Sequence, residues 1–112
     1  MRGVVVVLCI LVLVGCQNVQ SFSPTGSQTF DPYPESHAVD YYPDKDQIEK
    51  PYVVVGIGET RADEIPEALD IFRNMARKNG ADAFYGLDSE AIYMAVANYR
   101  TTFIRYKEEG DD

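Results

Sequence analysis

The residues of this chain best suited to metal chemistry are its single histidine and three acids close to it. His37 lies between Asp31, Glu35 and Asp40, and imidazole and carboxylate groups both bind metal ions. A stable zinc site needs three or four well-placed nitrogen or sulfur ligands, and one histidine without a free thiol does not supply them. We therefore expect an exposed or edge-strand histidine, and the sequence predicts no bound metal and no cofactor.

Two glycines form the second candidate site. Gly56 and Gly58 follow an apolar run, as in the glycine-rich fingerprint that binds dinucleotides. In that fingerprint a third glycine opens a helix whose N-terminus holds the pyrophosphate. Arg61 takes the place of the third glycine, and the next predicted helix starts too late to reach a phosphate. Close packing of a helix on the strand, or a bulge, is therefore the favoured interpretation of these glycines.

The remaining composition argues against catalysis and against nucleic-acid binding. No serine or cysteine can be paired with a histidine base to form an activated nucleophile. Asp63 and Glu67 lie four residues apart, which is the spacing of a solvated helix face. The formal net charge is −8, and such a chain is repelled by a phosphate backbone. The sequence predicts that the protein is not an enzyme and has no nucleic-acid partner.

The first sixteen residues have the pattern of a secretory signal. Arg2 is followed by an apolar run over residues 4–14, and then by Gly15 and Cys16. A basic start, an apolar middle and a small residue at the cut are the parts of such a signal. The apolar run of about eleven residues is too short for the bilayer core, which needs roughly 20. An ordinary signal, cleaved after Gly15 without lipidation, is one interpretation.

The end of this leader, Leu13-Val14-Gly15-Cys16, resembles the lipobox of bacterial lipoproteins. The resemblance implies cleavage between Gly15 and Cys16, a diacylglycerol on the Cys16 thiol, and an acyl chain such as palmitate on the new amino group. Stable membrane attachment takes at least two such chains. Gln17 stands where that family usually carries an inner-membrane retention Asp. The outer membrane, facing the periplasm, is therefore favoured in a host with two membranes.

The chain divides into four predicted segments. Residues 1–15 are the leader, and residues 16–29 are the lipidated cysteine and a polar, flexible tether. Residues 30–107 are one small domain, and residues 108–112 are an acidic tail. Removal of the leader takes away Cys9 and one positive charge, which leaves a single cysteine and a net charge of −9. An internal disulfide is therefore excluded from the mature chain.

A helix is predicted from about Asp63 to Asn79. Its apolar residues recur every three or four positions, and acids at its start and bases at its end suit the helix dipole. Gly80 then supplies a left-handed stop. The apolar stripe consists of Ile65, Ala68, Leu69, Phe72, Met75 and Ala76.

Strands are predicted on both sides of this helix. They cover residues 37–42, 52–58, 83–87 and 92–106. Asp88-Ser89-Glu90 is expected to turn the chain, and the long last stretch should contain a bulge or break, or a hairpin, near Asn98-Tyr99-Arg100. The order β-β-α-β-β predicts an α+β fold, a single mostly antiparallel sheet of about four strands with one helix packed on a face.

Two passages of the domain resemble the YbjQ/RcsF-like family, namely residues 50–56 and the Gly-Ala-Asp-Ala at residues 80–83 that leads from the helix into a strand. The resemblance covers about Ala38 to Tyr106. RcsF-type proteins carry disulfides, which the mature chain does not form, so disulfide-based sensing does not carry over. YbjQ-type proteins are similar to ring-forming oligomers, so this resemblance implies self-association as one mode of action.

The last predicted strand carries a candidate interface. Tyr93, Ala95, Ala97 and Tyr99 share one of its faces, and the even-numbered residues share the other. One helix covers only one face of a sheet, so the second apolar face needs another cover. Either the N-terminal strand or the segment over residues 30–33 folds across it, or it is a subunit or partner interface, where tyrosine and methionine are enriched.

These features predict a membrane-anchored, non-enzymatic lipoprotein of the cell envelope. The protein would attach to the membrane through lipid on Cys16 and act by protein contact, as a homo-oligomer or with an envelope protein. The alternative function is a module that binds a small molecule or a metal ion, either in the groove beside Gly56 and Gly58 or around His37.

Replacing Cys16 with serine is expected to release the protein from membranes, because the lipid on the thiol supplies about 0.8 kcal/mol per buried methylene. Cell fractionation followed by immunoblotting measures the membrane-bound share of the wild-type and Cys16→Ser proteins. Mass spectrometry of the native N-terminus is the control for lipidation. Continued membrane attachment of the variant, or a native product with an intact Met1 or an unmodified thiol, would contradict the anchor.

Overall fold

The computed structural model describes residues 20–26, 28–93 and 96–108, with backbone alone at residues 91–93. Its elements follow the chain as β1 (Gln20–Pro24), β2 (Asp40–Tyr42), the 3₁₀ turn η1 (Lys45–Gln47), β3 (Tyr52–Ala62), α2 (Ile65–Lys78), β4 (Ala83–Tyr93) and β5 (Val96–Tyr106). The predicted leader, the lipidation site at Gly15 and Cys16, and the acidic tail beyond residue 108 lie outside these described residues.

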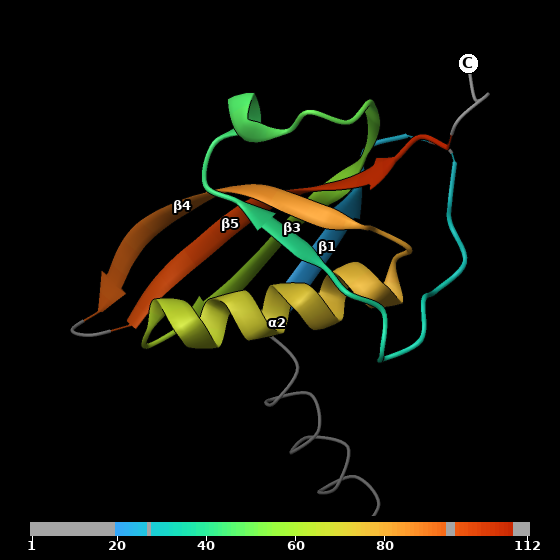
Figure 1. The fold of residues 1–112 in the computed structure, drawn as a ribbon. Helices are drawn as coiled ribbons and strands as arrows, with labels where there is room; N and C mark the ends of the chain where they lie inside the picture. Colours follow the sequence, from blue (N-terminus) through green and yellow to red (C-terminus); the bar gives the residue numbers. More distant parts are fainter. Residues whose placement is uncertain (1–19, 27, 94–95, 109–112) are drawn as a thin grey trace, which may run out of the picture.

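The five strands form one sheet in the order β1-β3-β5-β4-β2, and α2 packs across one of its faces (Figure 1). Neighbouring strands are antiparallel except β2 and β4, which are parallel. β3 and β4 run in the same direction and are joined through α2, with β5 between them, so they form a split β-α-β unit. The predicted α+β class is confirmed, with a single mostly antiparallel sheet and one helix on a face. The sheet has five strands rather than about four.

The fifth strand, β1, comes from the segment predicted to be a flexible tether. Gln20 pairs with Thr60 and Pro24 pairs with Gly56, so part of the tether lies along the edge of β3. The Phe22 ring packs against the hydrophobic core. The missing side chain of Gly56 makes room for this ring, since a Cβ there would lie 2.5 Å from it. One aromatic anchor and a free strand edge therefore outweigh the polar composition on which the tether prediction rested.

Helix α2 occupies its predicted position, with its apolar stripe against the sheet. Phe72, Met75 and Ala76 are among its buried side chains, whereas Ile65, also assigned to the stripe, is 53% exposed in the first turn. Gly80 has a φ of +70° just after the helix, which confirms the predicted left-handed stop. The helix is therefore held by a narrower stripe, shifted toward its C-terminal half.

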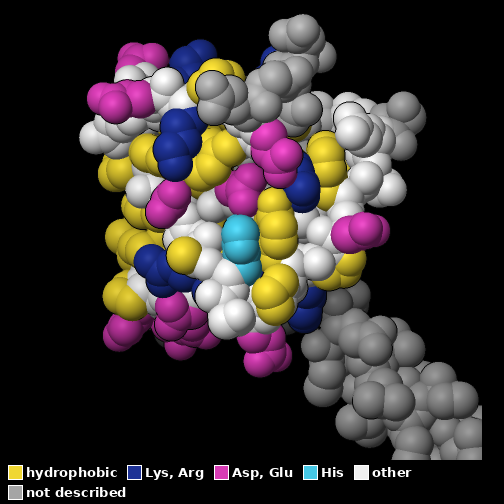
Figure 2. All heavy atoms as spheres, turned by 45° about the vertical axis from the view of Figure 1, so that its right-hand side comes forward, with side chains coloured by type: hydrophobic (Ala, Val, Ile, Leu, Met, Phe, Trp, Pro, Cys, Tyr) yellow, Lys and Arg dark blue, Asp and Glu magenta, His cyan; other side chains and the backbone are white. Residues whose placement is uncertain are grey.

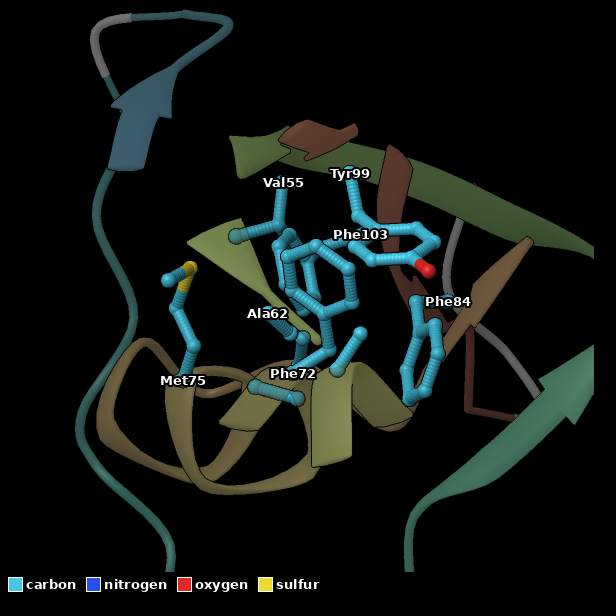
Figure 3. Packing of buried hydrophobic residues seen from close by; sticks show 10 residues of the cluster. Val55, Ala62, Phe72, Met75, Phe84, Tyr99 and Phe103 are labelled. Atoms are coloured by element: carbon cyan, nitrogen blue, oxygen red, sulfur yellow. The ribbon is translucent and has the colours of Figure 1, made fainter. Parts of the chain in front are cut away.

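The core is built around three phenylalanines, one from each of α2, β4 and β5 (Figure 3). The rings of Phe72, Phe84 and Phe103 are fully buried, and their centroids lie 5.8 to 5.9 Å apart. Each such aromatic pair contributes about 0.5–1.5 kcal/mol beyond the burial of its area. A Cβ on Gly58 would meet the Phe103 ring and lie 2.6 Å from the sulfur of Met75. Gly58 therefore allows the close helix–strand packing that the sequence predicted.

The C-terminal half of the sheet differs from the prediction. β4 runs unbroken through the predicted turn at residues 88–90, and β5 runs unbroken through the predicted break at residues 98–100. The chain reverses instead between Tyr93 and Val96. One irregularity lies at Gly86, whose φ of +69° accompanies a register shift between β4 and β5, and a second register shift lies between Ala91 and Tyr93. Residues 88–90 are exposed, so their polar composition reflects contact with solvent and not a turn.

Candidate functional site

The face of the sheet that α2 leaves uncovered, which we call the outer face, carries a group of tyrosines. Phe84 and Phe103 belong to the core against α2, so the residues that alternate with them point the other way. Tyr85 and Tyr106 belong to this second set, and Tyr52 pairs with Tyr106 across the β3–β5 ladder. The rings of Tyr52 and Tyr85 lie 6.3 Å apart, centroid to centroid. Side chains of β3, β4 and β5 therefore meet on the outer face.

A chain of hydroxyl groups links these tyrosines to the edge strand β2. The hydroxyl oxygens of Tyr42 and Tyr106 are 2.6 Å apart, and the Tyr106 hydroxyl donates to a carboxylate oxygen of Asp40 at 2.7 Å. Because Tyr106 has only one hydroxyl proton, Tyr42 is the donor to Tyr106. The ammonium nitrogen of Lys50 lies 4.6 Å from the centroid of the Tyr106 ring. The half-buried side chains of Tyr42, Tyr52, Tyr85 and Tyr106, with Val54 beside them, form what we call the tyrosine patch.

The hydroxyl chain fixes the protonation of Tyr106. Burial raises the pKa of Tyr106 well above its ordinary value, and the hydrogen bonds with Tyr42 and Asp40 raise it further. A tyrosine with the ordinary pKa of 10.0 is protonated at neutral pH, and the raised pKa keeps the Tyr106 phenol protonated at more alkaline pH as well. The hydroxyl of Tyr106 joins β5 to the short strand β2 through hydrogen bonds with Tyr42 and Asp40.

The tyrosine patch is only partly covered by the rest of the chain. The loop that contains η1 crosses the outer face on its way from β2 to β3, on the side of the sheet opposite α2 (Figure 1). The backbone N–H of Lys107 donates to the carbonyl oxygen of Pro51 at 2.9 Å, which holds the end of this loop beside the end of β5. Val54 remains 40% exposed beyond the loop. Ile104 alternates with Phe103 and so lies on the same outer face, but it is fully buried. The accessible part of the outer face is therefore Val54 together with the half-buried tyrosines.

The residues predicted to form an interface lie elsewhere. Tyr99 is 6% exposed and belongs to the core beneath α2 (Figure 3), and Ala97 packs against that core. The interface prediction is therefore corrected for Tyr99, which is a core residue because its strand face is the one that α2 covers. Ala95 and the side chain of Tyr93 lie outside the described residues.

The segment over residues 28–39, which we call the strap, contains residues 30–33, one predicted cover for the second face of the sheet. It lies instead at the C-terminal end of α2. The backbone N–H of Tyr33 donates to the carbonyl oxygen of Arg77 at 2.8 Å, and the Arg77 side chain donates to the carbonyl oxygen of His37 at 2.8 Å. A Cβ on Gly80 would lie 2.6 Å from the carbonyl oxygen of Asp31, so the strap passes directly over this glycine.

His37 holds the strap to the sheet. Its ring stacks on Tyr33 with centroids 3.7 Å apart, and its Nε2 lies 3.0 Å from a carboxylate oxygen of Asp82. The other oxygen of Asp82 accepts a hydrogen bond from the backbone N–H of Tyr106 at 2.9 Å. The pKa of Tyr33 is raised, mainly because the side chain is partly buried and secondly because it contacts the Asp82 carboxylate. Figure 2 shows the histidine side chain, in cyan, at the surface among hydrophobic side chains.

These partners explain the histidine without a metal ion. In the part of the chain that the structure describes, no group of three or more His, Cys, Asp or Glu side chains is placed to hold a metal. Asp40, one of the acids near His37 in the sequence, accepts a hydrogen bond from Tyr106 instead. The Asp82 of the Gly-Ala-Asp-Ala passage therefore has a structural role, since it joins the strap to the end of β5.

The two glycines considered as a phosphate loop face protein atoms. Gly56 lies under the Phe22 ring, and Gly58 lies under Phe103 and Met75. A cavity of about 230 Å³ opens beside Gly56, between β1, the strap, β3 and the end of α2. Its lining residues are Phe22, Pro24, Gln28, Thr29, Phe30, Val55 and Asn79.

Comparison of the chain with protein-family models, with curated proteins and with solved structures finds no match. The resemblances to the lipobox and to the YbjQ/RcsF-like family therefore stay predictions. Within the described ranges, no helix is both long enough and apolar enough to cross a bilayer.

The sequence analysis missed the tyrosine patch. Two of its members, Tyr42 and Tyr106, lie 64 residues apart in the chain and meet only through the sheet order. One sequence signal could have indicated this patch. Side chains two positions apart in a strand share a face, so Tyr52 and Val54 lie together on the face opposite that of their neighbours. The pairing of β3 with β5 was also needed, and no local pattern specified it.

Replacing Tyr106 with phenylalanine is expected to cost about 1–2 kcal/mol of stability at neutral pH, because the Asp40 carboxylate and the Tyr42 hydroxyl lose a partner. The raised pKa of Tyr106 means that the folded state disfavours the phenolate. This contribution to stability is complete below the ordinary pKa of 10.0, and it is lost as the pH rises above that value, since the unfolded chain then releases a proton that the folded chain retains.

In Tyr106→Phe the free energy of unfolding should therefore fall less steeply with rising pH in the alkaline range than it does in the wild type. Urea unfolding followed by circular dichroism, at several values from about pH 8 to about pH 11, gives the free energy of unfolding of the wild type and the variant. Tyr85→Phe, in the same patch, is the matched control. An unchanged alkaline slope in Tyr106→Phe would contradict the role given to this phenol.

Proposed function

We propose that the protein is a lipid-anchored component of the cell envelope that acts by binding another protein through the tyrosine patch, without catalysis. Its anchor is the diacylglycerol proposed on Cys16, and its partner is an envelope protein or a second copy of the chain. The observation that carries the proposal is the aromatic surface on the outer face, where Val54 is 40% exposed and four tyrosines are half-buried.

The tyrosine patch has the chemistry of a protein-binding surface. Tyrosine is enriched at interfaces because its ring buries a large apolar area while its hydroxyl keeps a hydrogen bond. The rings are already held in place, Tyr106 by Tyr42 and Asp40, and Tyr52 by contact with Tyr85. Little side-chain freedom is left to lose on binding, which favours affinity.

Charges of both signs lie beside the patch. The loop that contains η1 carries the exposed acids Asp44, Asp46 and Glu49 and the exposed lysines Lys45 and Lys50. Opposite charges across the rim of an interface speed association and suppress wrong partners. A partner surface with an apolar centre and a rim that also carries both signs of charge therefore fits this face best.

A photo-reactive p-benzoylphenylalanine at Val54 is expected to crosslink to the partner in intact cells, because this side chain is exposed beside the tyrosines of the patch. Glu67, exposed on α2 at the opposite face of the sheet, is the matched control position and should give no adduct. Immunoblotting measures the mass of the product, and a mass of two chains identifies a second copy as the partner. Absence of an adduct at Val54, or equal adducts at both positions, would contradict the proposed surface.

The alternative function, a small-molecule module, is favoured by one observation, the cavity beside Gly56. Phe22, Phe30 and Val55 give it apolar walls, and Gln28 and Asn79 add polar groups. Its volume of about 230 Å³ lies just below the range of about 300–1,000 Å³ that is usual for ligand pockets. A small apolar compound with one polar group is the class of ligand that fits.

A compound that binds in this cavity should raise the melting temperature of the mature protein, since a ligand at 100 times its Kd stabilises the native state by about 2.7 kcal/mol. Thermal-shift screening of small apolar compounds measures this effect. Thr29→Trp, which places a large side chain at the cavity wall, should remove the shift, whereas Ser36→Trp, on the strap outside the cavity, should keep it. A screen without a stabilising compound, or a shift that survives Thr29→Trp, would count against the alternative.

A further inference from the structure

We infer that the domain stands on the bilayer with one end of its sheet, which we call the proximal end, against the lipid surface, and with the tyrosine patch held at the opposite end. This inference rests on the proposed lipid anchor at Cys16. It adds an orientation that the anchor alone does not give, since a long flexible tether would let the domain turn freely.

The position of β1 makes the tether short. Strand β1 begins at Gln20, so only four peptide units join it to Cys16. A chain of four residues reaches at most about 14 Å. The Phe22 contact with the core and the pairing of β1 with β3 fix the start of this strand to the body of the domain. The bilayer surface therefore lies within about 14 Å of Gln20 when Cys16 is lipidated.

The direction of β1 selects the end of the sheet that meets the lipid. Because β1 is antiparallel to β3, the chain before Gln20 leaves toward the end of β3, where Gln20 pairs with Thr60. β3 ends at Ala62, which pairs with Ala97 near the start of β5, and α2 begins at Ile65. β4 ends at the same place, since Ala91 pairs with Ala97. The proximal end therefore consists of the end of β3, the start of α2, the end of β4 and the start of β5.

The tyrosine patch belongs to the other end. Tyr52 begins β3 and Tyr106 ends β5, and these two residues pair with each other. The 11 residues of β3 span about 33 Å at the usual rise of about 3.3 Å per residue. The patch is therefore held about 30 Å from the proximal end, clear of the headgroups.

The side chains of the proximal end suit a shallow contact with neutral lipid. Among the side chains that the structure describes at this end, Ile65 is the large apolar one that is exposed, at 53%, and it lies near the exposed acids Asp63, Glu64 and Glu67 and the exposed Arg61. Anionic headgroups repel these acids over a screening length of about 8 Å at physiological salt. The lipid on Cys16 must therefore hold the domain in place, and a zwitterionic bilayer is the surface that this end fits.

Energy transfer from a single dye to acceptor-labelled lipid tests the orientation in the mature, lipidated, full-length protein. Glu64→Cys labels the proximal end and Glu49→Cys labels the loop next to Tyr52, and both side chains are exposed glutamates in the wild type. The sulfur of Cys16 is occupied by lipid, so each introduced thiol takes the only dye. In phosphatidylcholine vesicles we expect at least about twofold greater transfer from position 64, because the two sites differ in height by about 30 Å.

Two further samples separate the possible failures. Twelve Gly and Ser residues inserted after Asn18 lengthen the tether, and they should make transfer from positions 64 and 49 nearly equal. If the protein does not float with the vesicles at all, the proposed anchor is wrong. If it floats but transfers equally from both positions with its natural tether, or more strongly from position 49, the anchor stands and the inferred orientation is overturned.

Discussion

The close approach of α2 to the sheet at Gly58 is the contact on which the other features depend. With no side chain at this position, Met75 and Phe103 pack into the space above β3, and Phe103 in turn contacts Phe72 and Phe84. A domain of this size buries little area, so the loss of one such aromatic cluster would remove a large part of its stability. The cluster also fixes which face of β3, β4 and β5 the helix covers.

Once α2 covers one face, the other face must meet solvent, the chain itself or a partner. Here the tyrosine patch is mostly amphipathic, with Val54 as its aliphatic member. Tyr42, Tyr52, Tyr85 and Tyr106 place apolar rings on the sheet, and the hydroxyls of Tyr42 and Tyr106 bond to each other and to Asp40. Such a surface is stable when exposed and still has apolar area to bury when a partner binds. A face of leucine and isoleucine would instead favour aggregation.

The sequence predicted the parts of the fold that local patterns encode. The stripe of α2 and the stop at Gly80 follow from a period near 3.6 and from one left-handed residue, and both are confirmed. The sequence analysis did not predict that β4 is continuous. The polar residues 88–90 suggested a turn, whereas the structure has a register shift beside Gly86 and the strand continues. The interface prediction rested on a face that the helix leaves uncovered, but Tyr99 lies on the face that α2 covers. Tyr99 lies four residues from Phe103 and so shares the side that α2 covers.

Strand β1 shows how a weak local element can set the geometry of the whole molecule. Its composition is that of a linker, and a flexible linker over residues 16–29 would have a root-mean-square length of about 20 Å and no preferred direction. Pairing with β3 and the fit of Phe22 over Gly56 place the start of β1 four peptide units after Cys16. If Cys16 carries the proposed lipid, so short a tether would confine the domain to a thin layer beside its attachment point and raise the local concentration of the surface that faces outward. Because the tyrosine patch lies at the far end of β3 from Gln20, a partner that binds the patch would approach from the side away from the proposed lipid anchor.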